Sequence, residues 1–170
     1  IYKRRQDNEK IIHISRTFHK YASKLSMPIY DIIVDNPWET ADDTLQTIDL
    51  LSKLSPPFSL NVFSLRLFPG TSLYYKALGE NILREGSSYE HYLSYRHNYL
   101  NLIIQLFALF SVPKWLLKLL LSKQLVNTKK EFNFLHTILY NCILYRRGFR
   151  SLLSGDISML PPRMQLFLCR

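Results

Sequence analysis

The stretch from Tyr30 to Thr71 constrains the fold most, because it combines a strand, a helix and a second strand in immediate succession. A run of β-branched and apolar residues, 29–34, predicts a strand that is buried on both faces. An amphipathic helix is predicted over residues 40–54, and a second strand over residues 58–68. Two strands joined by a helix of this length are expected to lie parallel in one sheet. The chain is therefore predicted to contain α/β structure.

Helix start signals support this division of the first half. Thr40 is a good N-cap, and the acidic Asp42 and Asp43 follow in the first turn, where the helix dipole favours negative charge. A preceding helix is predicted to begin at Asp7 or Asn8 and to continue to about residue 25.

The second half changes character after Gly79 and is predicted to be mainly α-helical. An apolar run over residues 100–112 is followed by a basic amphipathic turn or two over residues 114–123 and by a helix over residues 131–149. The apolar run is shorter than the roughly 20 residues that a bilayer span needs. We therefore expect a buried or interfacial helical layer rather than a membrane span.

The distribution of charge argues against a nucleic-acid partner. The net charge of +9 divides into +5 for residues 1–24, −5 for residues 25–57, +1 for residues 58–109 and +8 for residues 110–170. An acidic middle between basic ends does not make one continuous basic face, which nucleic-acid binding favours.

The cysteines indicate the cellular compartment, and the N-terminus indicates whether the chain is part of a longer protein. Cys142 and Cys169 are far apart, and neither has a second ligand at metal-binding spacing. We expect no disulfide framework and a reducing, cytoplasmic compartment. Residues 1–10 are polar and lack the apolar core of a signal peptide, and the missing initiator methionine suggests that the chain starts inside a longer protein.

Candidate ligand-binding residues lie at the two strand ends, because open α/β sheets and barrels bind ligands at the carboxyl edges of their strands. Asp35 and Asn36 follow the first strand, and each has a second interpretation as a turn residue before a proline. Ser64 and Arg66 share one side of the second strand. Arg66 needs an anionic partner if it is buried, or faces solvent. Ile33 lies two positions before Asp35, so both side chains are expected on the same side of the strand. Ile33 either faces the ligand or belongs to the core.

Three further groups have both a structural and a functional interpretation. The histidines lack the clustered spacing of a shared metal site, so we expect surface or interhelical positions for His13, His19, His91, His97 and His136. Three tyrosines are predicted to form a stripe on one helix, as core packing or as the lining of a substrate channel: Tyr92, Tyr95 and Tyr99. Basic residues beside Trp115 form either a solvated face or a contact with anionic lipid heads: Lys114, Lys118 and Lys123.

Three motifs in the first half resemble a known family. They are YDIIVDNPWETADD at residues 30–43, TIDLLSKL at 47–54 and FSLRLFPGTSLY at 63–74. In this order and spacing they are similar to the late barrel strands of radical S-adenosylmethionine (SAM) enzymes, in particular the subgroup whose radical domain follows a cobalamin-binding domain. Asp35-Asn36-Pro37 stands where commoner members have Gly-Leu-Pro. The resemblance covers residues 1–80.

The resemblance implies that residues 1–80 are the late βα units of a partial, TIM-like radical SAM barrel, and that residues 81–170 are a helical C-terminal extension. It places an iron–sulfur cluster and SAM in the intact protein, with cobalamin as a further cofactor of the subgroup. The residues that it assigns to contacts with SAM or substrate are Ile33, Asp35, Asn36, Ser64 and Arg66.

The family's cluster is held by a Cys-x-x-x-Cys-x-x-Cys loop, which this chain lacks. Three thiolates are needed, whereas the chain has two cysteines, so we expect it to bind no cofactor alone. The favoured interpretation is the C-terminal part of a radical SAM enzyme that needs its missing N-terminal half and acts on an unknown, hydrophobic substrate. We assign no catalytic and no metal-binding residue to it. One alternative is a non-catalytic interaction or membrane-surface module with peripheral membrane contact, and another is a small nucleic-acid-binding protein.

Overall fold

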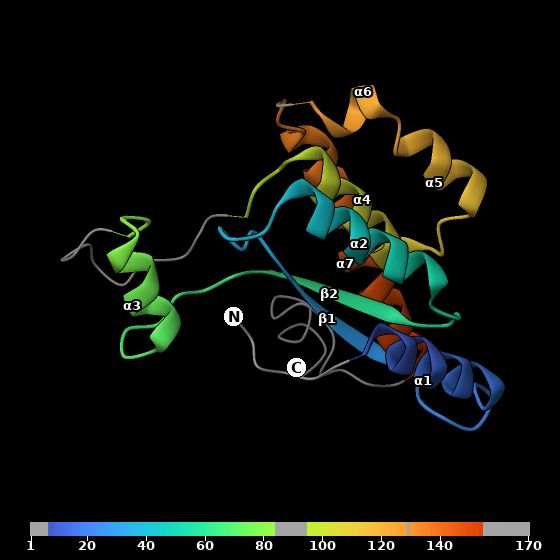
Figure 1. Cartoon of the computed structure of the whole chain (residues 1–170). Coiled ribbons are helices and arrows are strands. Elements are labelled where there is room, and N and C mark those ends of the chain that lie inside the picture. Colours follow the sequence, from blue (N-terminus) through green and yellow to red (C-terminus); the bar gives the residue numbers. More distant parts are fainter. Residues whose placement is uncertain (1–6, 84–94, 129, 155–170) are drawn as a thin grey trace, which may run out of the picture.

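The computed structural model describes residues 7–83, 95–128 and 130–154, which are mostly helical and contain one small parallel sheet (Figure 1). The elements are α1 (Asn8–Lys20), β1 (Ile29–Val34), α2 (Ala41–Lys53), β2 (Ser59–Ser64), α3 (Ser72–Gly79), α4 (Tyr99–Leu109), α5 (Lys114–Leu120), α6 (Lys123–Val126) and α7 (Asn133–Ser154). The predicted α/β class and the mainly helical second half are confirmed. The two strands form an open sheet, so the barrel stays a prediction.

The strand–helix–strand unit has the predicted parallel topology. In the register of β1 and β2, Ile29 lies beside Ser59 and Val34 lies beside Ser64. The backbone N–H of Leu65 donates to the carbonyl of Val34 at 2.8 Å and extends the ladder by one step. β2 ends at Ser64, four residues before the predicted end of this strand.

The helix caps follow the sequence signals. Asp7 caps α1 by accepting from the backbone N–H of Glu9 at 3.1 Å. Thr40 and Asp43 form a capping box at the start of α2, in which the backbone N–H of Thr40 donates to Oδ2 of Asp43 at 2.8 Å. This bond stabilises the carboxylate and lowers the pKa of Asp43. α1 ends at Lys20, earlier than predicted, and the chain continues as turns.

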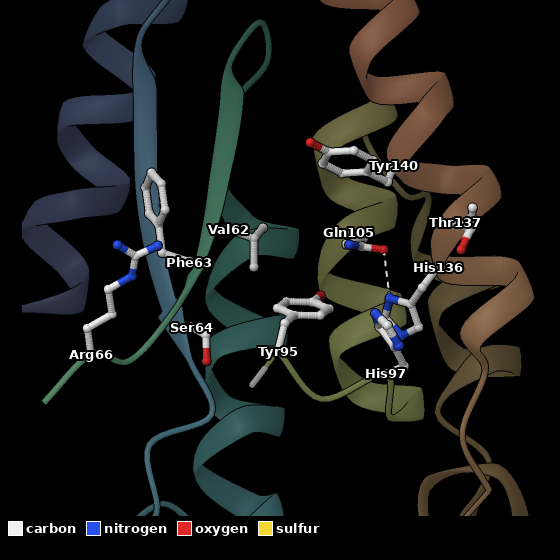
Figure 2. A pocket seen from close by; sticks show the side chains of 10 residues that line it. All are labelled: Val62, Phe63, Ser64, Arg66, Tyr95, His97, Gln105, His136, Thr137 and Tyr140. Atoms are coloured by element: carbon white, nitrogen blue, oxygen red, sulfur yellow. Dashed lines mark hydrogen bonds between the residues drawn. The ribbon is translucent and has the colours of Figure 1, made fainter. Parts of the chain in front are cut away.

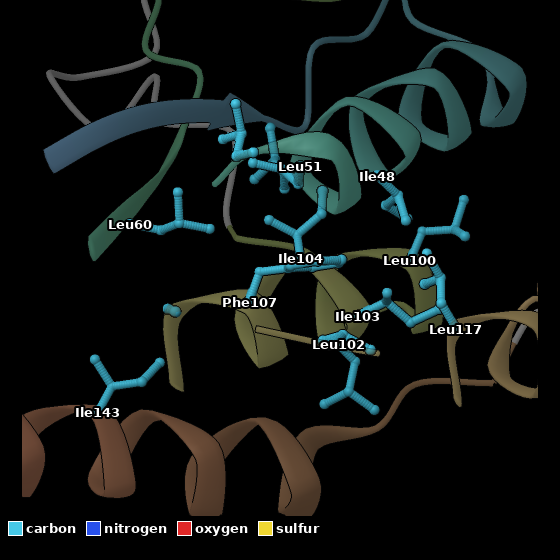
Figure 3. Packing of buried hydrophobic residues seen from close by; sticks show 14 of the residues in the cluster. Ile48, Leu51, Leu60, Leu100, Leu102, Ile103, Ile104, Phe107, Leu117 and Ile143 are labelled. Atoms are coloured by element: carbon cyan, nitrogen blue, oxygen red, sulfur yellow. The ribbon is translucent and has the colours of Figure 1, made fainter. Parts of the chain in front are cut away.

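One hydrophobic core joins the two halves of the chain (Figure 3). Ile48 and Leu51 of α2 and Leu60 of β2 belong to the same buried cluster as Ile103 and Ile104 of α4. Nine of the eleven residues of α4 are buried, so the predicted buried helical layer is confirmed. The cluster takes in residues on both sides of residue 80, while the division into two domains stays a prediction.

The two faces of the sheet differ sharply. Val34 and Leu60 are only 4% and 1% exposed, because α2 and α4 cover their side of the sheet. Ile33 and Phe63 lie side by side on the opposite face, and each is 50% exposed. The prediction that the first strand is buried on both faces is therefore wrong for this structure. Below, the side that carries Ile33 and Phe63 is called the open sheet face.

α3 has a small core of its own and lies apart from the helical layer (Figure 1). Leu65 and Leu67, in the extended chain after β2, are buried with Ala77 of α3. The indole Nε1 of Trp38 donates to Oε2 of Glu80 at 2.5 Å. These contacts position the chain that follows the carboxyl edge of the sheet.

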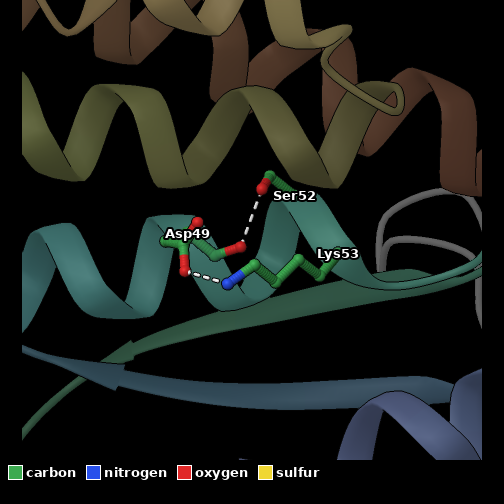
Figure 4. A network of polar contacts seen from close by, with 3 residues as sticks. All are labelled: Asp49, Ser52 and Lys53. Carbon is green, nitrogen blue, oxygen red and sulfur yellow. Dashed lines mark hydrogen bonds and ion pairs between the residues drawn. The ribbon is translucent and has the colours of Figure 1, made fainter.

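The solvent side of α2 carries a short polar network (Figure 4). Ser52 Oγ donates to the Asp49 carbonyl at 2.7 Å, and Lys53 Nζ lies 2.5 Å from Asp49 Oδ2. The side chains of the ion pair are 51% and 61% exposed, so the pair contributes little to stability.

Over the parts of the chain that the structure describes, no helix combines the length and the apolar character that crossing a membrane requires.

Candidate functional site

Asp35 ends β1 and ties the sheet to the start of α4. Its carboxylate accepts from the backbone N–H of Arg96 at 3.1 Å and from the side-chain amide of Asn101 at 2.8 Å. The residue is 9% exposed and has a left-handed backbone, with φ of 63°. Asp tolerates this region better than most residues do. Both carboxylate oxygens of Asp35 therefore hold the segment before and within α4.

Asn36 has the turn geometry that was one of its two interpretations. Its Oδ1 accepts from the backbone N–H of Trp38 at 3.2 Å, and its Nδ2 donates to Oε1 of Glu39 at 3.1 Å. With Asp35, Glu39 and Arg96 it lines a polar hollow of about 190 Å³.

The expected common orientation of Ile33 and Asp35 is wrong. β1 ends at Val34, and the positive φ of Asp35 breaks the alternation of the strand. Asp35 is consequently buried toward α4, whereas Ile33 stays on the open sheet face.

Ser64 and Arg66 border a different hollow from Asp35 and Asn36. A cavity of about 640 Å³ on the open sheet face is lined by Ile33, Phe63, Ser64 and Arg66, together with Asp31. The structure thus brings three of the five predicted site residues together and places the other two in the polar hollow at the end of β1.

A second cavity, of about 500 Å³, lies between β2 and the helices α4 and α7 (Figure 2). Ser64 and Arg66 border it from the strand side. The helical side supplies polar and aromatic groups: Tyr95, His97, Gln105, His136, Thr137 and Tyr140. We call this space the β2–α7 cavity.

Three rings pack together at the floor of the β2–α7 cavity. The ring centroids of Tyr95 and His97 are 5.6 Å apart, those of Tyr95 and His136 are 5.6 Å apart, and those of His97 and His136 are 4.9 Å apart. Oη of Tyr95 is buried and has no hydrogen-bond partner among the described residues. Burial, aided by the charge of Asp35, raises the pKa of Tyr95, so its phenol stays neutral.

His136 is 1% exposed and connects the N-cap residue of α4 to the middle of that helix. Its Nε2 donates to the carbonyl of Asn98 at 3.0 Å, and its Nδ1 lies 2.8 Å from Oε1 of Gln105. An imidazole that donates from both nitrogens is charged, whereas burial lowers the pKa of His136 and favours the neutral ring. The two observations agree if the Gln105 amide is rotated by 180°, so that its nitrogen donates to Nδ1 and the neutral ring donates only from Nε2. Both amide orientations have the same shape, because oxygen and nitrogen are similar in size.

Sequence reasoning missed this ring cluster. His97 and His136 are 39 positions apart, and no local spacing connects them. The predicted helical stripe of tyrosines is wrong at Tyr95, which precedes the first residue of α4, Tyr99; Tyr92 lies outside the described residues. The available signal was Gln105, a polar residue inside an apolar helix that needs a buried partner.

The described residues do not fit an iron–sulfur cluster. In residues 7–83, 95–128 and 130–154, no group of three or more His, Cys, Asp or Glu side chains is placed to hold a metal ion. Cys142 is an exposed free thiol, and Cys169 lies outside these ranges.

Comparison of the chain with protein-family models, with curated proteins and with solved structures finds no match. The resemblance to radical SAM enzymes therefore stays a prediction that rests on the three sequence motifs.

The buried state of His136 predicts loss of stability in acid. Its pKa is lower in the folded than in the unfolded chain, so the unfolded chain binds more protons below about pH 6.5. The contribution of His136 to stability is therefore fully present above that pH and is lost as pH decreases, by at most about 1.4 kcal/mol per pH unit for this one proton.

Urea unfolding at pH 7.5 and 5.5 measures the loss. His136→Gln should show a smaller loss, and His13→Gln, at an exposed position of α1, should behave like the native chain. Equal pH dependence in His136→Gln would contradict a neutral buried ring.

Proposed function

We propose that the chain forms late βα units in the wall of a radical SAM barrel and contributes side chains to the binding of SAM and substrate. The observation that supports this proposal is the open sheet face. In βα barrels the connecting helix packs outside the sheet, and the opposite face lines the interior. α2 connects β1 to β2, and its buried Ile48 and Leu51 belong to the same core cluster as Val34 and Leu60. Ile33 and Phe63 therefore point to the side that a complete barrel encloses.

The hollow on the open sheet face suits a ligand that has a flat apolar part and an anionic part. Ile33 and Phe63 offer apolar surface, and Arg66 offers a guanidinium at the carboxyl end of β2. SAM contains both an adenine ring and a carboxylate. A hydrophobic substrate acid likewise combines an apolar part with a carboxylate. In this proposal Asp35 and Asn36 do not contact the ligand in this hollow. They position the carboxyl edge of the sheet, because Asp35 holds the start of α4 and Asn36 holds the turn before α2.

The proposal assigns the iron–sulfur cluster to a missing N-terminal half, because this chain has two cysteines in total. When bound, the cluster and SAM, with cobalamin in the subgroup, would supply the radical chemistry. The described residues would bind and orient SAM and the substrate, and they would exclude water from the site. A reducing, cytoplasmic compartment suits such a centre.

Expression of this chain together with the reading frame upstream of Ile1 tests the proposal. After anaerobic reconstitution with iron and sulfide, the longer protein should bind a cluster. With dithionite as the electron donor, it should reductively cleave SAM to methionine and 5′-deoxyadenosine, whose added hydrogen atom comes from substrate or buffer. The 170-residue chain alone should do neither. A cluster held by the 170-residue chain, or an upstream frame that lacks the cysteine triad, would contradict the proposal.

One observation favours the second candidate function, a membrane-surface module. Trp115 and Leu119 of α5 are 70% and 65% exposed, and Lys114 and Lys118 are exposed beside them. Leu117 is buried and fixes the helix in this orientation. Aromatic and aliphatic side chains next to lysines suit the interface of an anionic bilayer.

Flotation with vesicles that contain phosphatidylserine tests the membrane-surface candidate. If α5 binds the bilayer, the chain floats with these vesicles, and Trp115→Ser reduces the bound fraction several-fold. Tyr75→Ser is the matched control, because Tyr75 is 62% exposed on α3. A chain that stays in the soluble fraction at low salt would exclude this function.

A further inference from the structure

α7 presents a continuous apolar stripe to solvent. Its members recur at steps of four, four, three, four and four residues, and we call them the α7 stripe: Phe134, Ile138, Cys142, Tyr145, Phe149 and Leu153. At about 100° per residue these positions fall within an arc of about 100° on the helix. The steps repeat after eleven residues, which keeps the stripe nearly straight along α7.

The stripe is exposed because the opposite side of α7 is fixed in the protein. His136 and Ile143 are 1% and 8% exposed and face the core. By contrast, Phe134, Tyr145 and Leu153 are 76%, 81% and 74% exposed. The helix therefore cannot turn the stripe inward without removing its own anchoring residues.

The stripe is large enough to be an interface. Aromatic residues bury about 150–250 Å² each, so three mostly exposed aromatic and three smaller side chains offer on the order of 600 Å². This area is at the upper limit of apolar patches on monomers. It approaches the roughly 800 Å² per partner of a standard protein interface.

The neighbouring charges disfavour a lipid surface as the occupant. The stripe itself contains no charged side chain. The nearby guanidinium groups are directed inward: Arg146 donates to the carbonyl of Ala108 at 3.0 Å, and Arg147 donates to the carbonyl of Leu60 at 2.7 Å. An anionic bilayer would find no described cation along the stripe, whereas a second apolar helix needs none.

The stripe is complementary to itself in antiparallel orientation. About a two-fold axis near its centre, the end residues Phe134 and Leu153 oppose each other, and Ile138 opposes Phe149. At the centre the small Cys142 opposes the large Tyr145. Each bulky side chain thus meets a smaller one, as close helix packing requires. Two-fold contacts of this kind are the commonest in homo-oligomers.

We propose that the α7 stripe is the interface of a homodimer in which the α7 helices of two copies pack antiparallel. This inference does not depend on the proposed function.

Sedimentation of the full chain over micromolar concentrations tests the dimer. The native chain should be dimeric, and Tyr145→Asp should raise the dissociation constant at least ~30-fold, as expected for a central aromatic residue. Tyr75→Asp is the control, since Tyr75 is exposed on α3. Circular dichroism of each variant confirms that it is folded. A chain that is monomeric at all concentrations, or a dimer that Tyr145→Asp leaves intact, would overturn the proposal.

Crosslinking gives an independent readout that needs no destabilising change. In a Cys169→Ser background, a short bismaleimide should join Cys142 of the two copies, because both thiols lie near the proposed two-fold axis. Cys142→Ser should abolish the covalent dimer. Absence of crosslinking while the chain sediments as a dimer would show that another surface forms the contact.

Discussion

Replacement of Asp35 by alanine is expected to lower the free energy of unfolding by about 2–4 kcal/mol. The change removes the acceptor of the Arg96 backbone N–H and one of the two acceptors of the Asn101 amide, which keeps the Arg96 carbonyl at 2.9 Å; Asn101 is only 3% exposed. A buried donor without a partner costs about 1–3 kcal/mol. Alanine also tolerates the left-handed backbone at this position less well than aspartate.

Asp35→Asn is the matched variant. It keeps one acceptor oxygen and suits a positive φ, so we expect about half of the loss caused by alanine. Urea unfolding of both variants measures the difference. A loss below about 0.5 kcal/mol for Asp35→Ala would show that the carboxylate does not hold α4 to the sheet, and would return Asp35 to the role of a ligand contact.

Ile104→Ala is expected to destabilise the protein by about 2–5 kcal/mol, because it leaves a cavity in a packed core. Ile104 is 1% exposed and belongs to the buried cluster that contains Leu51 of α2 and Leu60 of β2 (Figure 3). The loss should appear in a single unfolding transition, since this core joins both halves of the chain. Leu119→Ala, at a position that is 65% exposed, is the control and should cost far less. Two separate transitions would show that the halves fold independently.

Elements with strong local signals could be predicted from the sequence. β1 has the predicted bounds, Thr40 caps α2, and α4 is the buried helix predicted from its apolar run. These features depend on residues within one turn or one strand of each other. Local side-chain chemistry is therefore enough to specify them.

The features that were missed depend on contacts between distant segments. The left-handed backbone of Asp35 is supported by Arg96 and Asn101, which lie more than sixty positions later in the chain. The stacking of His97 on His136 requires α7 to pack against α4. No period in the sequence encodes either contact.

The error about the sheet has a related cause. An apolar strand sequence shows that both faces can be buried, but not which neighbours are present to cover them. In the described residues, Val34 and Leu60 are buried in one cluster with side chains of α2 and α4, whereas Ile33 and Phe63 on the other face are each 50% exposed. Ile33 on the open sheet face is the residue at which the sequence pattern and the structure disagree most directly, and our proposal explains the disagreement by a larger barrel.

Protection of a cysteine at position 33 tests that central claim most directly. In a Cys142→Ser, Cys169→Ser background, Ile33→Cys should react quickly with maleimide in the 170-residue chain, because Ile33 is 50% exposed. In the protein extended by its upstream reading frame, the same thiol should react at least ~10-fold more slowly, and SAM should slow it further. Tyr75→Cys, on exposed α3, is the control for general changes in reactivity. An unchanged rate at position 33 in the extended protein would contradict the assignment of the open sheet face to a barrel interior.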